Sequence, residues 1–259
     1  MTPTEKPFVY LILGAAGSGR REIVADLIEG GLDESEVPAV MLPAGGVAHA
    51  LDATLPRVSH WEWLDGAISG KLPAGATRVF FVTDGARNAV DQIEVFKPWL
   101  EAQGGQLAHV LCVVNVQFAA QHPPLLAWFE ACIHFSDIVL LNRREGVANK
   151  WLSDFLLHFK KQYFPCIFEY VKGGRLKNPA LVLEPQPRRM SHYFDEEQDW
   201  IFTNAEGEEI DEQEESGDGH EEIEAQPEED PYFARNTGGR RLKELPDIAK
   251  FLNEPSSRA

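Results

Sequence analysis

The residues best placed to do chemistry stand near the start of the chain, where an apolar strand-like run passes into a glycine-rich turn. They are Gly14, Gly17, Ser18, Gly19, Arg20 and Arg21. Their spacing is that of G-x-x-x-x-G-K-[ST], a loop whose backbone N–H groups surround phosphate oxygens. In that frame the lysine reaches the β- and γ-phosphates and the hydroxyl residue holds Mg²⁺. Here both positions are arginine, so the residues predict an intact phosphate-binding backbone with altered chemistry.

The two arginines have different consequences. Arg20 can still pair with a phosphate, because a guanidinium fork matches phosphate oxygens. Arg21 cannot coordinate a cation, so Mg²⁺ loses a ligand even if Arg21 is only a solvated helix residue. A glycine-rich turn can also be purely structural. Its position after a strand and before a helix favours a phosphate loop instead.

A second pattern follows the apolar run at 79–82. It resembles D/E-x-x-G, in which an acidic residue at a strand end orders magnesium and water and the glycine begins a switch segment. Gly85 is present, but Val82 holds the acidic position. Asp84 lies two residues beyond the position of the acid. Asp84 is therefore only a weak metal candidate.

A third pattern, at 142–145, resembles N-K-x-D, which reads guanine. Asn142 is in place, Arg143 stands for the lysine and Glu145 stands for the aspartate. A glutamate carboxylate accepts the same N–H donors as an aspartate carboxylate. We therefore predict that these three residues contact the base, although an Asn-Arg turn after a strand is a common feature.

The order of these patterns resembles that of the CobW-like metallochaperone GTPases. The stretch HVLCVVNVQFA followed by FSDIVLLNRREGV is similar to the corresponding part of that family, and the resemblance covers roughly residues 7–185. It implies a degenerate P-loop GTPase-like domain that binds GTP or another purine nucleotide. The family's C-x-C-C metal motif and its C-terminal sheet domain are not apparent, so the resemblance does not carry metal transfer onto this chain.

The elements that must position these residues alternate between strand and helix patterns. We expect strands at 8–13, 37–42, 57–63, 78–83, 107–115, 137–142 and 166–171, and helices at 20–29, 88–103, 124–134 and 148–162. Several strands are continuously apolar, as strands covered on both faces by helices are. The pattern predicts an α/β fold, a three-layer sandwich around a mostly parallel sheet, over residues 1–185.

The composition changes after this domain. The chain has a net charge of −17, but 18 of its acidic residues lie in 195–230, where there is no Lys or Arg. We expect 186–230 to be an acidic, mostly disordered linker. Residues 231–259 are mildly basic, contain aromatics and end with a short helical pattern. They would dock on a protein partner or fold back onto the domain; the alternative is a frayed terminus.

Composition narrows the setting and the partners. The three cysteines form no C-x-x-C pair, and the apolar runs are strand-sized, so we expect a cytoplasmic protein with reduced thiols and no membrane contact. Nucleic acid is an unlikely partner, because basic residues are sparse and the acidic segment repels phosphates.

Three functions fit this sequence. The first is a nucleotide-binding switch or scaffold, with GTP favoured, Mg²⁺ uncertain, and weak or absent hydrolysis. The second is an active NTPase or phosphotransferase that uses Arg20 in place of the lysine and Asp84 or Asp26 for the metal. The third is an interaction protein that binds no nucleotide and acts through residues 231–259.

Overall fold

The computed structural model describes residues 6–195, 200–203, 209–210, 224–227 and 229–252. The chain forms two compact units, one of residues 1–190 with 245–259 and one of residues 191–244. The first unit contains every candidate site residue. Among the described residues, no helix combines the length and apolarity needed to cross a bilayer.

The first unit is built on an eight-stranded sheet with the order β4-β3-β2-β5-β1-β6-β7-β8. The strands are β1 (Phe8–Leu13), β2 (Pro38–Pro43), β3 (Val58–Leu64), β4 (Ala67–Ser69), β5 (Arg78–Val82), β6 (Gln106–Asn115), β7 (Ile138–Asn142) and β8 (Ile167–Tyr170). All neighbouring pairs are parallel except β3 with β4. Because parallel strands end at the same edge, the segments after β1, β5 and β7 meet there.

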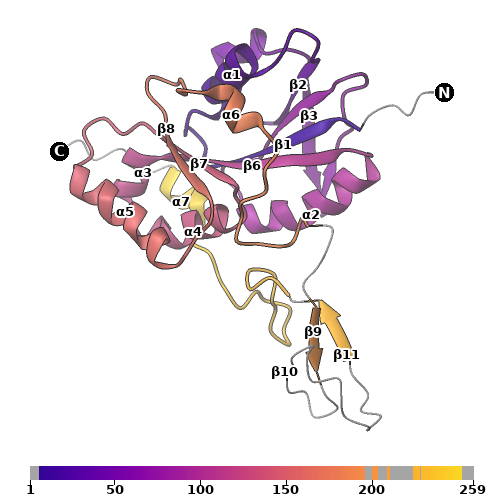
Figure 1. Cartoon of the computed structure of the whole chain (residues 1–259), viewed down its shortest axis with the longest axis vertical. Coiled ribbons are helices and arrows are strands. Elements are labelled where there is room, and N and C mark those ends of the chain that lie inside the picture. Colours follow the sequence, from indigo (N-terminus) through magenta and orange to yellow (C-terminus); the bar gives the residue numbers. More distant parts are fainter. Residues whose placement is uncertain (1–5, 196–199, 204–208, 211–223, 228, 253–259) are drawn as a thin grey trace. The chain divides into compact units, whose positions relative to one another are not determined.

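Helices cover both faces of this sheet (Figure 1). They are α1 (Arg20–Gly31), α2 (Ala89–Ala102), α3 (Val116–Gln121), α4 (Leu126–His134), α5 (Asn149–Lys161), α6 (Pro179–Leu183) and α7 (Ile248–Leu252), with 3₁₀ turns η1 (Ala50–Ala53) and η2 (Pro123–Leu125). The helices α1 and α6 lie on one face, and α2, α4 and α5 lie on the other (Figure 1). The structure therefore confirms the predicted P-loop NTPase-like α/β sandwich.

Apolar packing on each face fixes the start of α1 against the sheet. Ile23, Val24 and Leu27 are fully buried in a cluster that also includes Tyr10 and Phe80 from the sheet. On the opposite face, Trp61, Phe81, Phe96 and Trp99 form a chain of ring contacts with centroid distances near 5 Å. Burial of these large side chains supplies the main stabilisation of the unit.

The predicted strands and long helices are confirmed within one or two residues at most ends. The pattern did not predict β4, η1, α3 or α6, which are all six residues or shorter. Short elements carry too few residues for a periodic signal and depend on long-range contacts. The helix expected at 124–134 begins instead with the 3₁₀ turn η2 and continues as α4.

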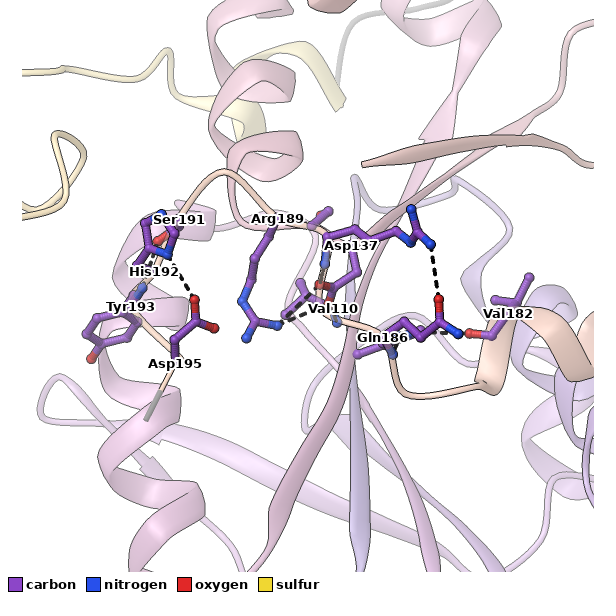
Figure 2. Close-up of polar contacts among 12 residues, drawn as sticks. Val110, Asp137, Val182, Gln186, Arg189, Ser191, His192, Tyr193 and Asp195 are labelled. Atoms are coloured by element: carbon purple, nitrogen blue, oxygen red, sulfur yellow. Dashed lines mark hydrogen bonds and ion pairs between the residues drawn. The ribbon is translucent and has the colours of Figure 1, made fainter. Parts of the chain in front are cut away.

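A buried ion pair fixes the chain after α6 to the sheet, on the side away from the glycine loop, where β7 begins (Figure 2). Asp137 precedes β7 and has no exposed surface, and its carboxylate accepts hydrogen bonds from the backbone N–H groups of Val110 and Arg188, both at 2.7 Å. The Arg189 guanidinium donates to both carboxylate oxygens, at 3.2 and 3.3 Å. This cluster ties residues 188–189 to the middle of β6 and to the start of β7.

The C-terminal helix α7 belongs to the first unit. Ile248 is 1 % exposed, and the Phe251 ring lies 5.5 Å from the His122 ring, just beyond α3. The short helix predicted within residues 231–259 is therefore present. It packs on the domain itself, which is one of the three arrangements that the sequence left open for residues 231–259.

The second unit contains a short antiparallel sheet of β9 (Trp200–Thr203), β10 (Glu209–Ile210) and β11 (Glu224–Pro227). These paired strands lie within the segment that we predicted to be disordered, most of whose remaining residues fall outside the described ones. In the same unit, Tyr232 and Phe233 are buried, and the Leu242 N–H donates to the Ala234 carbonyl at 2.8 Å. The predicted tail is thus divided between the two units after residue 244.

Candidate functional site

The turn between β1 and α1 has the backbone conformation of an anion-binding loop. Gly14, Gly17 and Gly19 have φ values of 133°, 73° and 91°, which favour glycine. A Cβ on Gly14 would lie 2.4 Å from the carbonyl oxygen of Val113, whereas Gly17 has open space around its Cα. Gly19 is the N-cap of α1 and supplies no side-chain cap. The first N–H groups of α1 are therefore free of a capping side chain and face the loop.

Ser18 places a hydroxyl group inside this loop. Its side chain is fully buried, and its Oγ has no hydrogen-bond partner among the described residues. A buried hydroxyl without a partner is uncommon in native proteins. A phosphate oxygen held by the loop would accept a hydrogen bond from this hydroxyl group, so the residues present fit a phosphate group.

Asn142 joins the second candidate region to the loop. It ends β7 and is 6 % exposed, and its Nδ2 donates to the Ser18 carbonyl oxygen at 2.9 Å. A Cβ on Gly19 would lie 2.3 Å from the same Nδ2, so only glycine fits there. The structure thus brings together Asn142, Ser18 and Gly19.

Arg20 turns toward the end of β5. Its Nη1 donates to the Thr83 carbonyl oxygen at 2.6 Å and lies 3.4 Å from the Thr83 hydroxyl. Burial lowers the pKa of Arg20 to about 10, and the nearby Asp84 carboxylate opposes this shift. Arg20 therefore keeps its positive charge at neutral pH, close to the loop.

Gly85, which follows β5, packs against the loop on the side of β1 away from Asn142. Its carbonyl oxygen accepts a hydrogen bond from the Ala16 N–H at 3.0 Å. A Cβ on Gly85 would lie 2.3 Å from the Ala16 nitrogen and 2.5 Å from Nη2 of Arg20. Gly85 thus supports the shape of the loop through close backbone contact.

Arg21 turns away from the loop and toward the segment between β2 and β3. Its Nε lies 2.6 Å from Oδ1 of Asp52, and its Nη2 donates to the Val47 carbonyl oxygen at 3.2 Å. The next residue, Glu22, has its Oε1 3.6 Å from Nε2 of His49 and 3.8 Å from Nη2 of Arg143. These contacts gather three segments at the N-terminus of α1.

The acidic residues proposed as metal ligands have other partners. The Asp84 carboxylate accepts from the Ala86 N–H and from Nε of Arg87, both at 3.0 Å. The buried Asp26 accepts from Arg175 and from the Leu176 N–H. Among the described residues, no group of three or more His, Cys, Asp or Glu side chains is arranged to hold a metal ion. Asp84 and Asp26 are thus engaged by protein donors, and Arg21 offers no oxygen ligand in place of a hydroxyl group.

The turn at 143–145 rests on α3. Arg143 has a positive φ of 53°, and its carbonyl oxygen accepts from the Gln117 N–H at 3.2 Å. The Gln117 amide group donates to the Glu145 carbonyl oxygen at 2.6 Å. The side chain of Glu145 is exposed, so its carboxylate is accessible to a ligand.

Sequence reasoning missed four residues of this region: Glu22, His49, Asp52 and Gln117. The available signal was Arg21 itself, because an arginine in place of the Ser or Thr of the loop pattern calls for an acidic partner. Spacing alone could not choose Asp52, which lies in a 3₁₀ turn between two strands that are not adjacent to β1 in the sheet.

Comparison with known proteins gives a distant structural likeness. No protein-family model and no curated protein matches the chain. Two solved structures of the YjiA GTPase are similar to it: the Zn(II)-bound protein from E. coli, with a TM-score of 0.40, and a Zn(II)-bound triple mutant, with a TM-score of 0.42. In both cases the identity is 15 %, and the match covers 71 % of this chain and 67 % of the other. The fold assignment above rests on strand order and loop geometry.

Proposed function

We propose that this protein binds a purine nucleoside polyphosphate, with GTP favoured, at the loop of residues 14–19, and acts as a switch or scaffold with weak or absent hydrolysis. The observation that carries the proposal is the unpartnered Ser18 hydroxyl, buried within a left-handed glycine loop at the uncapped start of α1. Such a loop offers backbone donors and the positive end of a helix dipole to an anion.

The base-binding end of the site supports a purine. Asn142 is tied to the loop, and the exposed Glu145 carboxylate follows three residues later. A carboxylate can accept both N–H donors on the Watson–Crick edge of guanine, whereas adenine presents a different donor pattern. This chemistry favours GTP over ATP.

Weak or absent hydrolysis follows from the residues near the phosphate end. Phosphoryl transfer depends on a cation at the β- and γ-phosphates and on a positioned water. Val82 is buried at the position of the expected acid, and the Asp84 carboxylate is held by Ala86 and Arg87. Arg21 replaces the hydroxyl ligand and pairs with Asp52. None of these groups is placed to hold a cation or to activate water.

Titration of the full chain with fluorescent GTP, GDP and ATP tests the proposal. The informative variant is Gly17→Asp, because Gly17 has open space around it and a carboxylate there would repel a phosphate. Gly104→Asp is the matched control: it too has a positive φ, 68°, and open space, but it precedes β6 at the opposite edge of the sheet.

We expect GTP to bind most tightly and Gly17→Asp to lose at least ~10-fold in affinity, which is about 1.4 kcal/mol. Gly104→Asp should bind like the unmodified protein. Turnover should not exceed the ~10⁻⁴–10⁻² s⁻¹ of intrinsic switch GTPases. No binding of any of the three nucleotides, or equal affinities for the two variants, would overturn the proposal.

A further inference from the structure

We infer that Arg21 holds the loop of residues 44–54 on the start of α1 without a metal ion, so that the site takes its anion free of Mg²⁺. The inference rests on the proposed nucleotide function and concerns the regulation of the same site. In nucleotide switches the corresponding loop is ordered by contacts with the γ-phosphate and Mg²⁺. Here Arg21 and Glu22 of α1 contact this loop.

The first contact joins Arg21 to two residues of the loop, Asp52 and Val47. Its guanidinium pairs with Oδ1 of Asp52 at 2.6 Å and donates to the Val47 carbonyl oxygen at 3.2 Å. Oδ2 of Asp52 accepts from the His49 N–H at 2.9 Å and closes a capping box on η1. One carboxylate therefore organises the 3₁₀ turn and binds the guanidinium.

The second contact joins Glu22 to the same loop. Nδ1 of His49 accepts a hydrogen bond from the Leu51 N–H at 3.2 Å, so a neutral His49 carries its proton on Nε2. That nitrogen lies 3.6 Å from the Glu22 carboxylate. The loop is thus attached to two consecutive residues of the first turn of α1, directly after the glycine loop.

The arginines near the loop disfavour a divalent cation at this site. Arg21 stands at the sequence position from which a hydroxyl would bind Mg²⁺, but its guanidinium group turns away from the loop and pairs with Asp52. Arg20 supplies the positive charge beside the loop, where it repels a divalent cation and attracts phosphate oxygens. The acid that would outweigh this repulsion is missing, because Val82 stands at its position and Asp84 is engaged.

Hydrogen exchange in the absence of nucleotide tests the attachment itself. Backbone amides of residues 47–54 should exchange at the same rate with Mg²⁺ and with EDTA, and at least ~10-fold faster in Arg21→Gln. Arg78→Gln is the matched control: its ion pair with Glu36 is about as exposed, 23 % and 17 % against 22 % and 27 %, but lies at the opposite edge of the sheet. Unchanged protection in Arg21→Gln would overturn the attachment.

Nucleotide titrations with and without Mg²⁺ test the consequence. The unmodified protein should bind GTP within ~3-fold of the same affinity in both buffers, and Arg21→Ser, which restores a hydroxyl, should gain from Mg²⁺. A gain of ~10-fold or more from Mg²⁺ in the unmodified protein would overturn the metal-free site. Absence of binding in both buffers would instead refute the proposed function, and the exchange data would still decide whether Arg21 holds the loop.

Discussion

Replacement of Asp137 by asparagine tests how the chain beyond α6 is held on the sheet. The side chain keeps its size but loses its charge, and one of its oxygens becomes an NH₂ group. Both oxygens now accept from donors: the Val110 N–H on one side, the Arg188 N–H on the other, and the Arg189 guanidinium on both. Whichever way the amide turns, its NH₂ group faces a backbone N–H.

The expected loss follows from the burial of this cluster. The side chain of Asp137 has no exposed surface and that of Arg189 is 5 % exposed, so water cannot replace the lost partners. A hydrogen bond to a charged group contributes about 1.5–3 kcal/mol, and breaking a buried ion pair costs about 3–5 kcal/mol. We therefore expect Asp137→Asn to lower the free energy of unfolding by about 3–5 kcal/mol. For a domain of this size, the melting temperature should fall by about 6–20 °C.

Urea unfolding of the full chain, followed by far-ultraviolet circular dichroism, measures this loss. The control is Arg188→Ala, because Arg188 contributes its backbone N–H to Asp137 while its side chain contacts Gln186 at the surface. That variant should stay within about 0.5 kcal/mol of the unmodified protein. The m-values should be unchanged, which shows that the same surface is exposed on unfolding. A loss below about 1 kcal/mol in Asp137→Asn would refute the argument from burial.

Two further predictions concern the loop and the buried thiols. Asn142→Asp sets a carboxylate against the Ser18 carbonyl oxygen, now 2.9 Å from the amide nitrogen, and should weaken GTP binding by at least ~10-fold more than Asn142→Ala. Equal losses in a fluorescent-GTP titration would count against this role of the amide. Burial raises the pKa of Cys166 to about 12 from its ordinary value of 9.0. In the folded protein the alkylation rate of Cys166, followed by mass spectrometry, should therefore keep rising with pH between pH 9.0 and about pH 12, whereas in urea it should level off above pH 9.0. The same pH profile in both conditions would contradict the burial effect.

The sheet and the loop could be predicted because their signals are local. Continuous apolar runs identify strands that are covered on both faces, and glycine spacing identifies the left-handed positions of the loop. The contact of Asn142 with the loop could also be anticipated, because the carboxyl ends of parallel strands share one edge. The apolar runs and the glycine spacing are local signals, whereas the contact of Asn142 with Ser18 joins residues 124 positions apart and depends on the strand order.

The partners of charged residues could not be predicted in the same way. Asp137 is the polar first residue of the strand expected at 137–142, yet it is fully buried, and Arg189, 52 positions later, pairs with it. Arg21 reads as a solvated helix residue, yet it pairs with Asp52. Such pairings depend on where the chain returns in space, which no periodic pattern records.

Asp84 shows how one local assumption changes a functional prediction. If β5 had continued, strand alternation would have placed Asp84 on the same face as Val82. The strand ends at Val82, and Asp84 instead begins a turn in which its own carboxylate accepts from Ala86 and Arg87. A carboxylate that stabilises its own turn is a poor ligand for an added cation, because binding the cation would break those hydrogen bonds.

The altered positions around the loop act in one direction. Under the proposed function, Val82 offers no carboxylate, the Asp84 carboxylate is engaged by its own turn, and Arg21 offers a guanidinium group, paired with Asp52, in place of a hydroxyl ligand. Each change weakens a divalent cation site, while the backbone cradle and the Ser18 hydroxyl still suit an anion. The Arg21–Asp52 pair gives this arginine a structural partner, so under the proposed function its role is to hold the loop of residues 44–54 and not to bind a cation.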